Sequence, residues 1–112
     1  MSKKDVTELI KRLERFEQRT GIRVEGLSAF AEEYDGGFTV TVRGEAHSID
    51  GDEIKSDSKI EVSLLDKSGR VVVVGNEYLE ADSFFGFQTL DVPVELSGSS
   101  LAKICIVSRL EG

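Results

Sequence analysis

Apolar residues near the start of the chain recur at intervals of three and four, which is the spacing of one face of an α-helix. The positions that form this stripe are Val6, Leu9, Ile10, Leu13 and Phe16. The remaining positions carry mostly good helix formers, and Gly21 follows where a helix commonly ends. The pattern predicts an amphipathic helix over residues 3–20.

From Ile22 onward the apolar period changes to two, which indicates strands with one buried face. Turn residues then divide the chain into extended segments. Asp35-Gly36-Gly37 and Asp66-Lys67-Ser68-Gly69 each join two of these segments, and both have the chemistry of a hairpin turn. The expected strands are residues 26–34, 38–43, 60–64, 70–75, 83–89, 90–96 and 102–110, with 97–100 as a loop before the last.

A change of phase in one segment favours two packed sheets over a single flat one. Phe85 and Phe87 have the opposite parity to Leu90 and the apolar positions after it, so a bend near Gln88 and Thr89 would be needed to bury both sets. Pro93 lacks a backbone donor and predicts that this segment lies at a sheet edge or near a strand end. The expected fold is an antiparallel, immunoglobulin-like β-sandwich preceded by the helix.

Length and composition limit the organisation to one domain. The chain has 112 residues, of which 39% are apolar, enough for a single core. We therefore expect one domain over 1–112, with the helix at 3–20 and the β-sandwich body at 22–112.

The charge is acidic overall but unevenly divided. There are 21 acidic and 14 basic side chains, a net charge of −7, which disfavours binding to nucleic-acid phosphates. Residues 1–21 hold six basic and four acidic groups, while residues 22–112 hold eight and seventeen. The N-terminal segment is thus +2 and the body −9, so attraction favours docking of one on the other.

No segment has the length of apolar sequence that a membrane or a secretion signal requires. The longest purely apolar run is Val71–Val74, against about 20 residues for a spanning helix. The single Cys105 is compatible with a reducing compartment. We expect a cytoplasmic protein without membrane insertion.

The stretch from Val62 to Val72 reads as strand, turn and strand, and residues 57–87 around it resemble the FxLYD family of small immunoglobulin-like domains. Leu64 and Asp66 match the family's motif, whereas Val62 replaces its Phe and Leu65 its Tyr. The resemblance implies a β-sandwich that serves as a binding or structural module, with no catalytic residues.

Catalytic constellations are scarce. His47 is the only histidine, and no strained nucleophile turn accompanies it, so a Ser-His-Asp hydrolase is the least favoured interpretation. Cys105 lies between two isoleucines, a setting typical of inert packing. One Cys and one His are also too few for a structural zinc site. We expect no enzyme activity and no cofactor.

A cluster of carboxylates invites comparison with a calcium loop. Asp50, Asp52 and Glu61 would fall on the first, third and twelfth positions of an EF-hand. Ile54 and Lys55 then occupy positions that need an oxygen ligand and a glycine. The cluster is better explained as a solvated acidic loop, so no metal is expected.

The aromatic pair Phe84 and Phe85 raises a question of cover, because adjacent residues of a strand face opposite ways. One ring can enter the core, and the other needs the helix, a loop or a partner over it. The apolar stripe of the predicted helix must likewise be covered, by the sheet or by a partner. The candidate interface residues are Val6, Leu9, Leu13, Phe16, Phe84 and Phe85.

These features predict a non-enzymatic interaction or structural module that binds a protein partner or self-associates. The alternative is a carrier of a small apolar ligand, with the helix laid across a curved antiparallel sheet.

Overall fold

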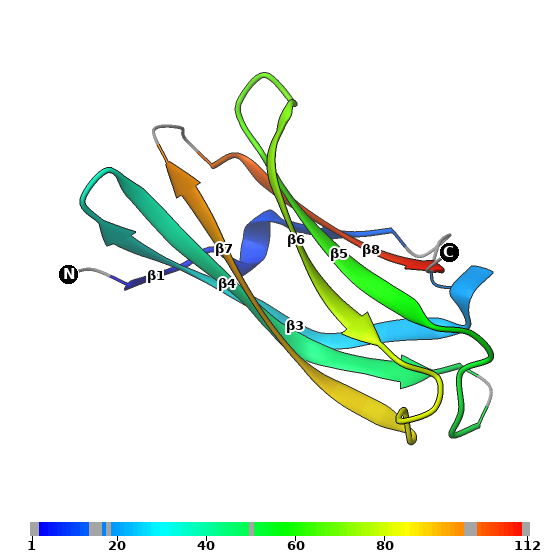
Figure 1. Cartoon of the computed structure of the whole chain (residues 1–112). Helices are drawn as coiled ribbons and strands as arrows, with labels where there is room; N and C mark the ends of the chain where they lie inside the picture. Colours follow the sequence, from blue (N-terminus) through cyan, green and yellow to red (C-terminus); the bar gives the residue numbers. More distant parts are fainter. Residues whose placement is uncertain (1–2, 14–16, 18, 50, 98–100, 111–112) are drawn as a thin grey trace.

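Two four-stranded sheets make up the part of the chain that the computed structural model describes, residues 3–13, 17, 19–49, 51–97 and 101–110 (Figure 1). The first sheet has the order β1-β3-β4-β7 and the second the order β2-β8-β5-β6. Neighbouring strands are antiparallel except β2 and β8, which run parallel. The strands are β1 (Lys3–Asp5), β2 (Ile10–Arg12), β3 (Ile22–Tyr34), β4 (Gly37–Ser48), β5 (Ser58–Leu65), β6 (Val71–Leu79), β7 (Phe87–Ser97) and β8 (Lys103–Leu110).

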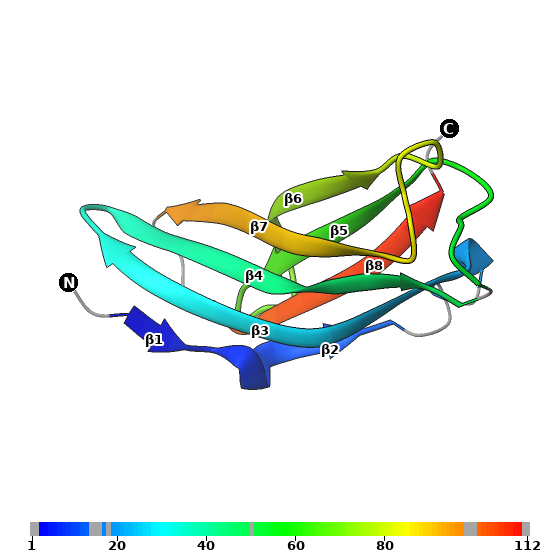
Figure 2. The same cartoon turned by 90° about the horizontal axis from the view of Figure 1, so that it is seen from below.

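The sheets pack face to face, so the predicted two-sheet sandwich is confirmed (Figure 2). Alternate residues of each strand point into the core, as the period of two requires. On β7 the buried set begins at Leu90 and continues with Val92, Val94 and Leu96, and it packs in one cluster with Ile60, Val62 and Leu64 of β5.

The predicted N-terminal helix over 3–20 is wrong. The same segment forms β1, a 3₁₀ turn at Thr7–Leu9 and β2, so it runs from the first sheet to the second. A single helical turn, closed by the Gly21 N–H donating to the Glu17 carbonyl at 2.9 Å, precedes β3. The molecule is therefore a β-sandwich whose first segment is part of the sandwich.

Backbone pairing explains why the strand form wins over the helix. The Val6 N–H donates to the Ala29 carbonyl at 2.9 Å, and the Leu13 N–H donates to the Ile106 carbonyl at 3.2 Å. If the N-terminal segment were a helix, the edges of β3 and β8 would lose these partners and expose unpaired backbone groups. Val6 is also buried and Leu9 packs against the core, so apolar side chains of the N-terminal segment are covered although the segment is not a helix.

A buried carboxylate fixes the end of this N-terminal segment. Glu17 is 4% exposed, and its Oε1 accepts a hydrogen bond from the Val24 N–H at 2.8 Å. Its Oε2 lies 3.0 Å from Nε of Arg12 but is not aligned for a hydrogen bond. Arg12 in turn donates through Nη1 to the Val24 carbonyl at 2.8 Å. Both side chains thus bond to the backbone of Val24, near the start of β3, and hold β2 beside this strand.

Replacing Glu17 with Ala should lower the free energy of unfolding by about 1–3 kcal/mol, because the buried Val24 N–H then loses its acceptor. Urea denaturation measures the loss. As a control, Asp91→Ala removes an exposed carboxylate 3.8 Å from Arg43 and should cost less than about 1 kcal/mol. Equal losses in the two variants would show that the buried Glu17 carboxylate does not stabilise the fold.

Both predicted hairpins are confirmed. Tyr34 pairs with Gly37 across a two-residue turn in which Gly36 has a φ of 91°, a conformation that favours glycine. In the β5–β6 hairpin, Asp66 Oδ1 accepts hydrogen bonds from the Ser68 N–H at 2.9 Å, the Ser68 hydroxyl at 2.6 Å and the Arg70 N–H at 3.1 Å. These donors, the Ser68 hydroxyl first, lower the pKa of Asp66 below its ordinary 3.8.

Asp66 should therefore titrate below 3.8 in an NMR pH titration, and Ser68→Ala should move its pKa back toward that value. Since the pKa is lowered in the folded state, the stabilisation is present above the unfolded pKa and is lost as the pH falls through the folded pKa. An Asp66 pKa that does not change in Ser68→Ala would contradict this assignment.

The bend expected near Gln88 and Thr89 is also wrong. β7 pairs with β4 without a break from Phe87 to Ser97, and Phe85 precedes the strand. Phe85 and Leu90 therefore do not belong to one strand, because the residues before Phe87 form a loop. Within β7, Phe87 faces outward and Leu90 faces the core. Pro93 lies in β7, which is at the edge of the first sheet, as predicted.

The FxLYD resemblance stays a prediction, which the order of strands neither confirms nor refutes. No helix among the described residues is long and apolar enough to cross a membrane.

Candidate functional site

The six candidate interface residues do not form one surface. Val6 and Phe84 are buried in the core, and Leu9 and Leu13 are half-buried along the N-terminal segment. Phe16 lies outside the described residues. Among the five candidates that the structure describes, Phe85 alone is strongly exposed, at 80% of its surface.

The loop before β7 holds the two adjacent rings in opposite environments. Phe84 is 4% exposed, and its N–H donates to the Glu80 carbonyl at 2.9 Å. Gly86, with a φ of 82°, donates through its N–H to the Asp52 carbonyl at 2.7 Å, and the Phe87 N–H donates to the Phe85 carbonyl at 3.0 Å. Phe85 is thereby presented to solvent between two fixed neighbours. The expectation that one ring enters the core is confirmed, and no helix covers the other.

Sequence reasoning missed the surroundings of Phe87, which is 53% exposed on the outward face of β7. His47 pairs with Phe87 in the β4–β7 register, and the two rings stack with centroids 5.6 Å apart. His47 Nε2 lies 3.0 Å from Glu45 Oε1 and 3.3 Å from Glu25 Oε2. His47 lies beyond the strand predicted at residues 38–43, and its stacking on Phe87 depends on the β4–β7 register, which no local pattern in the sequence provides. We call Phe85, Phe87 and His47 the aromatic patch.

The patch is bordered by carboxylates. Glu25 and Glu45 are directly opposite each other in the β3–β4 register, where like charges repel. His47 lies within 3.3 Å of both, and Arg23 Nε is 3.0 Å from Glu25 Oε1. This end of the first sheet therefore presents aromatic surface beside two acidic groups.

The calcium interpretation finds no assembled site in the part of the chain that is described. Glu61 lies in β5 and accepts a hydrogen bond from Nε of Arg109 at 3.3 Å. Asp52 is in the loop tied to Gly86, and Asp50 lies outside the described residues. Within those residues, no three carboxylate, histidine or cysteine side chains are grouped to hold a metal ion.

The two candidate catalytic side chains lie apart from each other. His47 is in β4 of the first sheet, with carboxylates and the Phe87 ring as its described contacts. Cys105 is a half-buried free thiol in β8 of the second sheet, paired in register with Ser63. The structure does not bring them together.

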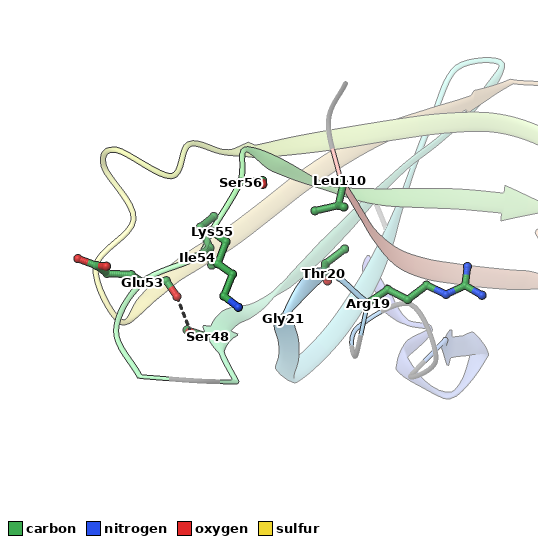
Figure 3. Close-up of a pocket in the computed structure, with 9 residues that line it drawn as sticks. All are labelled: Arg19, Thr20, Gly21, Ser48, Glu53, Ile54, Lys55, Ser56 and Leu110. Atoms are coloured by element: carbon green, nitrogen blue, oxygen red, sulfur yellow. Dashed lines mark hydrogen bonds between the residues drawn. The ribbon is translucent and has the colours of Figure 1, made fainter.

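One end of the sandwich contains a cavity of about 270 Å³ (Figure 3). It is somewhat below the roughly 300–1,000 Å³ of typical ligand sites. Figure 3 shows the Glu53 carboxylate and the Arg19 guanidinium directed away from it, and the Ser48 hydroxyl donating to the Glu53 carbonyl at 2.8 Å. Ile54 and Leu110 contribute apolar surface to an otherwise polar lining. The cavity thus offers few converging groups to orient a ligand.

Comparison with known proteins found no match: no family model, no curated protein and no solved structure matches this chain.

Gly86→Ala should disturb the aromatic patch, because an alanine at a φ of 82° is strained by about 1–2 kcal/mol. We expect altered NMR shifts of the Phe85 and Phe87 rings together with that loss of stability. Gly69→Ala is the matched control, since Gly69 has a φ of 85° in the turn between β5 and β6, without an aromatic neighbour in the sequence. It should cost a similar free energy and leave both ring signals in place. Unchanged ring signals in Gly86→Ala would show that this glycine does not position Phe85.

Proposed function

We propose that the protein is a non-enzymatic interaction module that binds a protein partner through the aromatic patch. The observation that carries this proposal is the exposure of Phe85, at 80%, on a loop anchored by a buried neighbour. An exposed aromatic side chain costs free energy until a partner covers it, and aromatic residues are enriched at the centres of protein interfaces. Because Phe84 and Gly86 fix the loop, little further ordering would be required on binding.

The charge around the patch indicates the chemistry of the partner. Glu25 and Glu45 border it, and the whole chain has a net charge of −7. A segment with an apolar side chain beside Lys or Arg would cover the Phe85 ring and add a cation to the carboxylates that Arg23 and His47 already contact, and cations also associate with aromatic faces. The proposed partner is a basic segment of another protein. An immunoglobulin-like, FxLYD-related module in the cytoplasm fits this role.

The carrier alternative loses its basis, because it required a helix over a curved sheet to enclose a pocket. The N-terminal segment instead completes the two sheets as β1 and β2.

Selection of peptides from a displayed random library on the purified protein tests the proposal. We expect enriched peptides with an apolar residue beside Lys or Arg, and Phe85→Ala should weaken their binding roughly 30-fold, the effect of losing about 2 kcal/mol at an interface anchor. Titration calorimetry on the selected peptides gives the affinities.

Tyr34→Ala is the matched control for this experiment. Tyr34 is 40% exposed, and its hairpin lies at the opposite end of the sandwich from the Phe85 loop (Figure 1). The control should leave peptide affinity unchanged. A library that enriches nothing, or peptides that bind Phe85→Ala as tightly as the original protein, would exclude the aromatic patch as the binding surface.

A further inference from the structure

The chain has a single histidine, and this residue lies in the aromatic patch. An imidazole is the side chain whose charge ordinarily changes between about pH 5 and pH 8. His47 is therefore the group through which the patch can respond to pH near neutrality. A change of its charge matters at this place because carboxylates border the patch.

Charged side chains reach His47 from two strands of the first sheet. Glu45, on the same strand β4, has Oε1 3.0 Å from Nε2 of His47, and Glu25 of β3 has Oε2 3.3 Å from the same nitrogen. Arg23 lies opposite His47 in the β3–β4 register, with its Nε 3.0 Å from the other oxygen of Glu25. One nitrogen of the imidazole thus serves two carboxylates that face each other, and one of these is shared with a guanidinium.

β7 and the loop beside it supply the other neighbours. The Phe87 ring stacks on the imidazole, and Thr89, opposite Glu45, is the next residue of β7 on the same face. Neither side chain is charged. The Asp52 carboxylate lies next to Gly86, the residue before Phe87. Among the described residues, the charge around the imidazole is therefore mainly negative.

The two carboxylate oxygens show where the imidazole takes up its proton. Nε2 must carry an N–H, since its lone pair would otherwise be directed at both oxygens. The proton gained at lower pH therefore goes to Nδ1. His47 then holds a full positive charge between Glu25 and Glu45, and this charge lies against the Phe87 ring.

We propose that His47 is a pH-sensitive switch, which weakens the hold of the aromatic patch on a basic segment as the pH falls. This regulation rests on the proposed function, because it acts on the same surface. The charged imidazole occupies the carboxylates of Glu25 and Glu45 and the Phe87 face, and it repels the Lys or Arg of the partner. At higher pH the neutral imidazole leaves the negative charge of both carboxylates to that cation.

Titration calorimetry of the selected peptides at about pH 7.5 and about pH 5.5 tests the switch. The affinity should be about three- to five-fold lower at the lower pH, the effect expected of a charge at a partly exposed site. The matched control is each peptide with Gln in place of its Lys or Arg, which should bind equally at both pH values. In His47→Gln, whatever affinity remains for the basic peptides should also be the same at both.

The outcomes separate the switch from the proposed function. Basic peptides that bind equally at both pH values, or that lose the same factor in His47→Gln, would overturn the switch and leave the binding surface in place. A library that enriches no peptide would remove the proposed function and the switch with it.

An NMR pH titration of the free protein provides a second readout that needs no peptide. The carboxyl carbon signals of Glu25 and Glu45 should show a step that coincides with the titration of the His47 ring. Glu32 is the matched control, because this exposed carboxylate of β3 lies opposite Thr39, toward the other end of β4. Its signal should not follow His47. Carboxyl signals of Glu25 and Glu45 that ignore the titration of His47 would also overturn the switch.

Discussion

The sandwich depends on how its open sheet edges are satisfied. A strand at the edge of a sheet has backbone donors and acceptors without partners, and burying or exposing them without pairing has a cost. The N-terminal segment resolves two such edges at once, because β1 pairs with β3 and β2 pairs with β8. Its passage from sheet to sheet also closes that side of the core over Val6. The contact between Glu17, Arg12 and the start of β3 then holds this closing segment in place.

The start of β3 pairs with the end of β4, so the same end of the first sheet displays surface groups on fixed strands. His47 and Phe87 stack because β4 and β7 keep one register along their full length. Phe84 is buried at the same end, so the neighbouring Phe85 is held outward by the packing of the core. The aromatic patch is thus a consequence of rigid strand pairing and of one anchored loop.

The sequence predicted the elements whose signal is local. Both hairpins follow from turn chemistry at Gly36 and Asp66, and the position of β7 at an edge follows from Pro93, because these residues act on their own backbone. The helix over 3–20 could not be excluded locally, since its apolar spacing is helical. What decides against it is pairing with β3 and β8, which lie up to about a hundred positions further along the chain.

The candidate site was less accessible to sequence reasoning for the same reason. Phe85 stands out from the sequence alone, but the stacking of His47 on Phe87 needs the register between two strands forty positions apart. Two of the candidate interface residues, Val6 and Phe84, are part of the core instead. A pattern shows which residues need cover, and only the tertiary structure shows whether the chain supplies it.

The same distinction applies to β6. Gln88 satisfies the Tyr78 carbonyl and bonds Glu77 Oε2 at 3.2 Å, so the chain itself occupies the edge at that end of the strand. Toward the other end of β6, the register with β5 shifts between Val73 and Val71, and Gly75 lies against the Val92 and Val94 side chains of β7. An edge strand that carries an irregularity and packs against the neighbouring sheet offers a poor template for a further strand. The edges of this sandwich are thus managed at β6 by packing against β7, as they are at β3 and β8 by pairing with the N-terminal segment.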